Sequence, residues 1–342
     1  MTRPLIVIKL GGDALATAER IAAQAGRLAR RARTERVVAV ASARRGVTDH
    51  LVTLVERVQH AVGAVPGSHP EADRAIAAGE VVSASLLSLA LEGLGCRAVS
   101  LDAREAGLSS DGRFGTARLT AVDPAPIRRL LDQGVIPVVT GFQGWYEGRV
   151  TTLPRGGSDC TAVSLAISLG AERCDLVKES GGLYTADPRL VPEARPLRSA
   201  THQFLTALAE AGAQVMQPEA AMLAEQAGLP LWFLPLDHDE PVSAVSAAAG
   251  NGLLRGVAVR RLSDGVSAVT AVAAQPVAPR EWDRLTAELA AARLEAREVL
   301  PAPARCTFRL PADTAARAAR LIHAAFVGEP HACAEPAAGR SH

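Results

Sequence analysis

The sequence predicts an α/β fold, in which an open, mostly parallel sheet is sandwiched by helices, followed by a small α+β domain. Short apolar strands alternate with longer segments of helical spacing over the first two thirds of the chain. The strands are apolar throughout, as expected when both faces of a parallel sheet are covered. Near residues 235–251 the composition shifts to Asp, Pro, Ser and Ala, which marks a connection between two domains.

The first domain is expected to alternate strands and helices. Residues 5–10 and 36–42 are predicted as the first two strands, with a helix at 15–33 between them. The segment 104–119 contains glycine and is predicted to be irregular. The other predicted elements are helices at 71–94, 124–134, 158–170 and 200–213 and strands at 96–102, 135–142, 174–179 and 229–234.

The last third predicts a small module of the order β-α-β-β-α. Its elements are expected at 266–274, 279–294, 296–303, 305–312 and 313–326. The sequence therefore suggests a first domain at 1–235, a linker at 236–252, a second domain at 253–328 and a disordered tail at 329–342.

Composition argues against several functional classes. The chain of 342 residues is 48% hydrophobic and carries a net charge of +1 without a clustered basic stretch, which disfavours nucleic acid or an anionic membrane as partner. No uninterrupted apolar segment reaches the roughly 20 residues of a membrane-spanning helix. The five cysteines and eight histidines lack the spacing of a disulfide framework or a metal site. We expect a cytoplasmic protein without a metal bound by protein side chains alone.

The first candidate site follows the first strand, where Lys9 precedes Gly11 and Gly12. Ligands of open α/β sheets bind beyond the carboxyl ends of the strands. Glycines there let backbone N–H groups approach a phosphate, and the ammonium supplies positive charge. Lys9 is one of only two lysines among 37 basic residues, the other being Lys178. The alternative is an ordinary tight turn between a strand and a helix.

The second candidate site is "TTLPRGGSDCTAVSLAISLG", residues 151–170. Gly156 and Gly157 stand just before a helix that Ser158 or Asp159 is expected to cap. Arg155 adds a fork suited to a carboxylate or a phosphate. A carboxylate beside an anion site is costly unless it serves a cap, a metal ion or a lysine, so Asp159 is predicted to be functional. The alternative is a simple acid in the first helical turn.

The third candidate site is "VKESGGLYTADPRLVPEA", residues 177–194. Lys178 and Glu179 end a strand, and the loop with Tyr184 and Arg189 is predicted to cover a nucleotide base and its phosphates. The sequence has neither the GxxxxGK[ST] phosphate loop nor the GxGxxG dinucleotide fingerprint. A bound nucleotide therefore requires another scheme.

The chain resembles the aspartokinases of the amino acid kinase family over residues 5–235. The blocks that carry the resemblance occur in the family's order: "IKLGG", "VASARRGVTDHL", "AAGEVVSASLL", "AGLSSDGRFGTARL", "GVIPVVTGFQG", "TTLPRGGSDCTAVSLAISLGA", "GGLYTADPRLVPEARPL" and "AGAQVMQP". The remaining third resembles one shortened ACT-type module, whereas aspartokinases usually carry two. Because ACT modules usually bind effectors as pairs, the resemblance implies a homodimer.

The resemblance also implies roles for the candidate residues, with ATP and Mg²⁺ as cofactors. Lys9 would contact the transferred phosphoryl group, and Asp159 would organise the catalytic lysines. The implied nucleotide-binding residues are Lys9, Gly11, Gly12, Gly157, Lys178, Glu179, Tyr184 and Arg189. The positions that match those holding L-aspartate are Ser42, Thr48, Glu80, Arg155 and Ser158. For Ser42 and Thr48, the alternative is capping of a helix that starts near Thr48.

Several residues depart from the family pattern on the phosphate side. Asp13-Ala14 stands where aspartokinases usually have Thr-Ser, the family's Thr-Asp-Val-Asp-Gly becomes Lys-Glu-Ser-Gly-Gly with Gly181 in the fourth place, and Gln214 replaces the lysine of "GAKVLHP". We hypothesise that Lys178 has taken over the role of that lysine. The alternative is a surface lysine.

These observations predict an ATP-dependent kinase that converts L-aspartate or a close analogue to 4-phospho-L-aspartate. A second hypothesis is a catalytically weakened homologue that acts as an amino acid-binding regulatory subunit. A third is a kinase for another small carboxylate.

Overall fold

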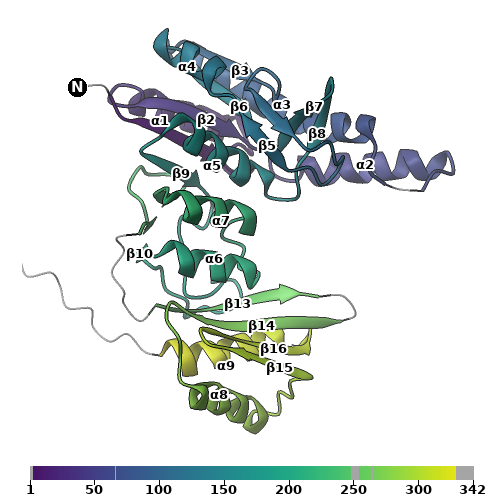
Figure 1. The fold of residues 1–342 in the computed structure, drawn as a ribbon, viewed down its shortest axis with the longest axis vertical. Helices are drawn as coiled ribbons and strands as arrows, with labels where there is room; N and C mark the ends of the chain where they lie inside the picture. Colours follow the sequence, from purple (N-terminus) through teal and green to yellow (C-terminus); the bar gives the residue numbers. More distant parts are fainter. Residues whose placement is uncertain (1–2, 66, 248–253, 263–264, 329–342) are drawn as a thin grey trace, which may run out of the picture. The chain divides into compact units, whose positions relative to one another are not determined.

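The computed structural model describes residues 3–65, 67–247, 254–262 and 265–328. Their contacts group into two compact units, shown as a ribbon in Figure 1. The larger unit contains 1–183, 196–210 and 214–251, and the smaller contains 184–195, 211–213 and 252–342. Two short segments inside the predicted first domain thus join the smaller unit, which the division by sequence did not anticipate.

The larger unit is built on an eight-stranded sheet of order β10-β12-β11-β9-β1-β2-β6-β3. Among the described strands of this sheet, only β11 and β12 pair antiparallel, so the predicted, mostly parallel sheet is confirmed. The strands are β1 Leu5–Leu10, β2 Arg36–Ala41, β3 Ala98–Leu101, β6 Ile136–Thr140, β9 Arg173–Val177, β10 Ser199–Ala200, β11 Leu231–Leu234 and β12 Ser243–Val245. Strand β12 lies inside the predicted linker 236–252, which is therefore partly sheet.

Seven helices accompany the described strands of this unit (Figure 1). They are α1 Ala18–Arg31, α2 Val47–Ala61, α3 Pro70–Gly93, α4 Ala125–Asp132, α5 Gly157–Leu169, α6 His202–Glu210 and α7 Pro218–Ala227. Helix α1 is shorter than predicted because Thr17 accepts a hydrogen bond from the Arg20 amide and caps the helix there. Helix α7 was not predicted.

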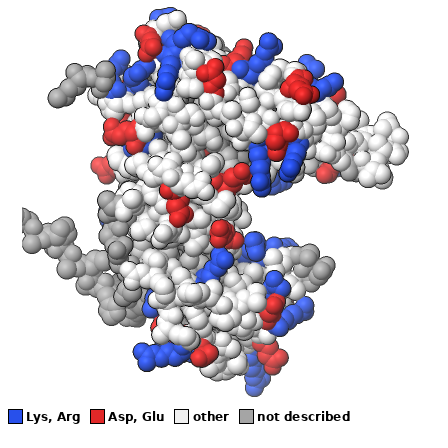
Figure 2. Space-filling model, viewed as in Figure 1, with Lys and Arg blue, Asp and Glu red and all other residues white. Residues whose placement is uncertain are grey.

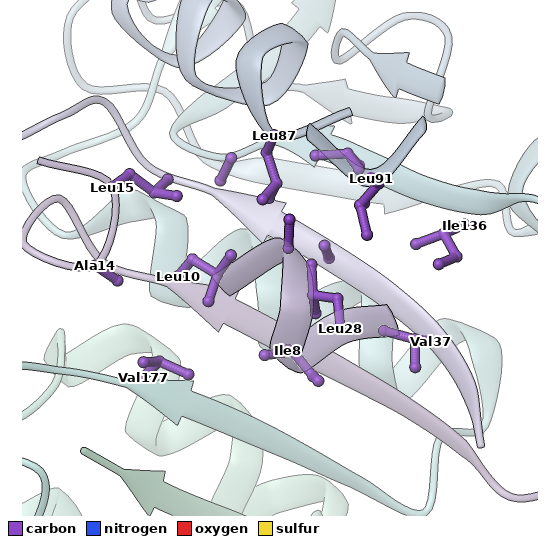
Figure 3. Packing of buried hydrophobic residues seen from close by; sticks show 14 of the residues in the cluster. Ile8, Leu10, Ala14, Leu15, Leu28, Val37, Leu87, Leu91, Ile136 and Val177 are labelled. Carbon is purple, nitrogen blue, oxygen red and sulfur yellow. The ribbon is translucent and has the colours of Figure 1, made fainter. Parts of the chain in front are cut away.

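Side chains that alternate along each strand cover the two faces of the main sheet. On β1, Ile6, Ile8 and Leu10 join one core cluster with residues of α1 and α3, drawn in Figure 3. Successive side chains of a strand point to opposite faces. Val7 and Lys9 therefore point to the other face, where α5 packs against β1, β2 and β9.

We expect Leu87→Ala on α3 to destabilise the fold by about 2–5 kcal/mol, because it leaves a cavity in this cluster. Leu87 is fully buried and belongs to the same cluster as Leu91 and Ile136, which are labelled with it in Figure 3. Leu89 on the same helix is 65% exposed and serves as the control. Urea titration followed by circular dichroism gives both values. Equal losses for Leu87→Ala and Leu89→Ala would contradict this packing.

The larger unit also contains a second, four-stranded sheet of order β5-β4-β7-β8. Its strands are β4 Leu108–Ser110, β5 Leu119–Val122, β7 Gln143–Tyr146 and β8 Arg149–Thr152. The prediction of an irregular 104–119 is wrong, since it contains β4 and the start of β5. These strands span only three or four residues, too short for a periodic pattern to stand out.

The smaller unit has an antiparallel sheet of order β13-β14-β16-β15 with two α-helices. Its elements are β13 Arg255–Arg261, β14 Val266–Ala273, α8 Pro279–Ala291, β15 Glu298–Ala302, β16 Arg305–Pro311, α9 Ala315–Ile322 and a π-helix at His323–Val327. Strand β13 was not predicted, because its arginines obscure the apolar pattern. The predicted tail 329–342 lies outside the described residues.

The added segment 184–195 belongs to the core of the smaller unit. Ala186 and Val191 pack in one cluster with Phe308 and Phe326. The Thr185 hydroxyl lies 2.8 Å from Nε2 of the buried His323. Apolar packing and a buried polar contact thus hold this segment in the unit.

Helix α3 is the described helix with the length and apolar composition of a membrane span. A core helix passes the same test, and the Leu87 face of α3 is buried in the cluster above. Figure 2 shows acidic and basic side chains interspersed over the face that it draws.

Candidate active site

The register of β1 and β9 brings the two lysines together. Lys9 pairs with Leu176 and Leu10 with Val177, so Lys178 follows β9 beside the end of β1. Val177 lies in the core cluster on the opposite face, so Lys178 points toward α5, as Lys9 does. Helix α5 supplies Asp159 between them. The Lys9 ammonium lies 2.8 Å from Oδ1 and the Lys178 ammonium 3.3 Å from Oδ2 of Asp159.

The Asp159 carboxylate is fixed from several sides. The backbone N–H of Gln217 donates to Oδ2 at 3.3 Å, and the Lys178 ammonium also donates to the Val215 carbonyl. Burial alone would raise the pKa of the Asp159 carboxyl, but the ammonium groups of Lys178 and Lys9 outweigh it and hold the pKa well below its usual value. Asp159 is therefore ionised, and it orients two cations while cancelling only one charge.

The predicted cap of α5 is wrong. Gly156, with φ of 82°, is the N-cap, and no side chain caps the helix. Ser158 and Asp159 lie inside the first turn, where Asp159 binds the lysines instead. Gly157 is confined as well, since a Cβ there would lie 2.5 Å from the Leu153 side chain. The glycine pair thus serves a tight entry into α5.

The Gly11-Gly12 turn is packed against two neighbouring loops. The Gly11 amide donates to the Val177 carbonyl at 3.2 Å, and a Cβ on Gly12 would lie 2.8 Å from the Ala43 carbonyl oxygen. The Arg45 amide donates to the Gly12 carbonyl at 3.1 Å. The loops after β1 and β2 therefore approach so closely that only glycine fits at residue 12.

Residues after β2 lie close to Glu80 on α3. The Ala43 amide, next to Ser42, donates to Glu80 Oε1 at 3.0 Å. Glu80 Oε2 is buried and has no hydrogen-bond partner among the described residues. Burial raises the pKa of the Glu80 carboxyl to about 7. An unpaired buried carboxylate suits a cationic group of a ligand.

Arg155 is exposed and forms an ion pair with Asp49 in the first turn of α2. Helix α2 begins after Gly46 without a side-chain cap, so Thr48 does not cap it. Ser158 lies beside the end of β6, since a Cβ on Gly141 would approach its hydroxyl to 2.5 Å. The packing of Ala43 and Val47 against Gly79 brings the β2 loop and α2 to the Glu80 region of α3.

Several residues of this region were missed in the sequence. Arg45 and Asp49 were not singled out, although Arg45 lies in the loop that follows a buried strand. Gln217 was also missed, since its role depends on the position of α7. It lines a cavity of about 470 Å³ together with Arg113, Arg118, Pro154, Glu219 and other residues beside the start of α5.

Tyr184 and Arg189 belong to the smaller unit and are not among the residues that the larger unit gathers. The Arg189 guanidinium lies 2.7 Å from the Asp187 carboxylate. Their assignment to a nucleotide stays a prediction.

The described residues contain no group of three His, Cys, Asp or Glu side chains placed to hold a metal ion. This part of the chain thus offers no cage made of protein ligands alone.

Comparisons with known proteins point to one family. Residues 4–234 match the model of the amino acid kinase family. The chain is 40% identical over 229 residues to an aspartokinase of Thermus thermophilus, covering 66% of this chain and 55% of that protein. The chain thus spans about half the length of such curated relatives.

Solved structures give a similar result. Aspartate kinase from Synechocystis has 30% identity and a TM-score of 0.62 over 96% of this chain and 57% of its own. Aspartokinase III from E. coli, solved with aspartate and ADP, has a TM-score of 0.80 over 94% of this chain and 100% of its own, at 19% identity. At 19% identity, the similarity to the E. coli protein shows a shared fold.

Proposed function

Because this chain belongs to the amino acid kinase family, we propose that it phosphorylates the side-chain carboxylate of L-aspartate, or of a close analogue, with ATP. A carboxylate oxygen forms a bond to the γ-phosphorus, and the bond from that phosphorus to the β,γ-bridging oxygen breaks. The products are 4-phospho-L-aspartate and ADP. The relatives called aspartokinase and the E. coli neighbour solved with aspartate and ADP support the choice of substrates.

The observation that carries the proposal is the pair of ion pairs that Asp159 forms with Lys9 and Lys178. Phosphoryl transfer needs reactants in line and neutralisation of the charge on the transferred group, with little covalent chemistry by the protein. Two ammonium groups held by one carboxylate supply net positive charge at the strand ends. Their preorganisation lowers the reorganisation needed in the transition state.

The remaining residues would bind the two substrates. Arg155 pairs with the α-carboxylate and Glu80 with the α-ammonium of aspartate, while the hydroxyls of Ser42, Thr48 and Ser158 orient the chain. Gly11 and Gly12 would lie along the nucleotide phosphates. The other proposed nucleotide contacts are Gly157, Glu179, Tyr184 and Arg189.

Mg²⁺ would enter with the nucleotide, held by phosphate oxygens and water. It would neutralise charge on the phosphates when bound. The lysine pair then orients and neutralises the transferred group from the protein side.

Two further proposals concern the oligomeric state and the cellular compartment of the protein. A homodimer through the ACT-like smaller unit follows from the module's resemblance, because paired modules form its effector sites. The cytoplasm is the expected compartment.

An assay of ADP release tests the proposal. The full chain is incubated with MgATP and L-aspartate, related amino acids or no acceptor, and hydroxylamine traps the acyl phosphate. We expect ADP and hydroxamate in equal amounts with aspartate, and neither from Lys9→Ala. Aspartate binding without ADP release would favour a regulatory subunit, and turnover with another acid alone would replace aspartate as substrate.

A further inference from the structure

Three loops meet at the edge of the sheet where the lysines lie. Strands β9, β1 and β2 are adjacent and parallel, so their carboxyl ends share one edge. Asp13 follows β1, Arg45 follows β2 and Glu179 follows β9. Nη1 of Arg45 lies 3.0 Å from Oδ1 of Asp13 and 3.6 Å from Oε1 of Glu179. One guanidinium thus links all three loops.

The backbone beneath this guanidinium is fixed. The Arg45 amide donates to the Gly12 carbonyl at 3.1 Å, and Arg20 donates to the Asp13 carbonyl at 2.8 Å. The Arg45 side chain, in contrast, is 63% exposed. The fixed backbone of Arg45 places its positive charge at the glycine turn, and the exposed guanidinium remains accessible to a ligand.

The acidic neighbours create an electrostatic problem for a nucleotide at this edge. Asp13 and Glu179 would repel the phosphates that the glycine turn is proposed to hold. Arg45 cancels part of this charge. Exposed ion pairs are weak, so a phosphate can compete for the guanidinium. Both contacts use Nη1, and Nη2 and Nε carry further N–H groups.

We propose that Arg45 is a further nucleotide-binding residue, whose guanidinium binds the polyphosphate while Asp13 and Glu179 hold it at the glycine turn before binding. The inference rests on the proposed function for the identity of the nucleotide. It explains how a chain with two carboxylates at the phosphate edge still accepts an anion there. A bidentate fork suits phosphate oxygens better than a point charge does.

Calorimetric titration of ADP into the full chain tests this role. We expect Arg45→Ala to weaken ADP binding at least tenfold and Arg45→Lys to weaken it less, since the charge remains. Arg36 is the first residue of β2, at the end of the strand opposite to Arg45, and its guanidinium lies 2.6 Å from the Asp132 carboxylate. Arg36→Ala is the matched control and should bind ADP as the wild type does. Circular dichroism verifies that each variant is folded.

The counter-ions give an opposite prediction. Asp13→Ala removes the nearer counter-ion of the guanidinium and should tighten ADP binding severalfold, with the gain lost in combination with Arg45→Ala. Unchanged ADP affinity in both Arg45 variants overturns the inference, as does wild-type chain that binds no ADP. The titration needs no phosphoryl transfer. A chain that fails the aspartate assay yet loses ADP affinity through Arg45→Ala refutes the proposed reaction and supports Arg45.

Discussion

Replacing Lys178 with alanine is expected to lower kcat by about two to three orders of magnitude, the usual cost of one preorganised donor at a developing charge. The Lys178 ammonium is held by Asp159 and by the Val215 carbonyl, and Asp159 also binds Lys9. We propose that both ammonium groups contact the transferred phosphoryl group. KM for aspartate should stay within about twofold, because Arg155 and Glu80, not Lys178, are the proposed ligands of that substrate. Steady-state kinetics with varied aspartate and saturating MgATP separates the two constants.

The fold should tolerate this change. Asp159 keeps Lys9 and the Gln217 amide as partners, so Lys178→Ala leaves no bare buried carboxylate. Lys178→Arg keeps the charge but replaces a compact ammonium with a planar fork, and should recover only part of the rate. An unchanged kcat in Lys178→Ala would mean that Lys9 acts without a second lysine.

The wild-type pH profile gives an independent measure of Lys178. Burial lowers the pKa of its ammonium, and Asp159 only partly opposes this. Above that lowered pKa the group is neutral and no longer assists transfer. We therefore expect kcat to fall on the alkaline side at a pH below the usual range of lysine.

Changing Glu80 to glutamine is expected to raise KM for aspartate by about tenfold or more, the worth of a hydrogen bond to a charged group. Burial raises the pKa of Glu80 to about 7, so the carboxylate that is proposed to bind the α-ammonium forms only near neutral pH. Wild-type KM should consequently rise about tenfold from pH 8 to pH 6, as the ionised fraction falls. Glu80→Gln should show no such rise. A pH-independent wild-type KM would contradict this role.

The same carboxyl also affects stability with a definite sign. Its pKa rises from 4.5 in the unfolded chain to about 7 on folding, so the folded chain binds the proton more tightly. Stability therefore falls as pH rises through this window and levels off above it, by on the order of 3 kcal/mol at most. Glu80→Gln removes this dependence. We expect its Tm, relative to wild type, to increase from pH 5 to pH 8.

The sequence by itself predicted six of the eight strands of the main sheet and missed the short β10 and β12. Apolar strands such as 5–10 and 36–42 sit between helices with clear spacing, so their burial could be read directly. Lys9, Asp159 and Lys178 were also singled out by rarity and by chemistry. The short strands β4, β7 and β8 and the arginine-bearing β13 left no comparable pattern.

Only the tertiary structure decided how the charged residues meet. The pairing of Lys9 with Leu176 puts both lysines on the α5 side, and α7 adds the Gln217 amide. Sequence periodicity gives the face of a strand, but neither its neighbour nor its register, which depend on contacts between distant segments. For the same reason, Asp13, Arg45 and Glu179 became one cluster only when three parallel strands were aligned.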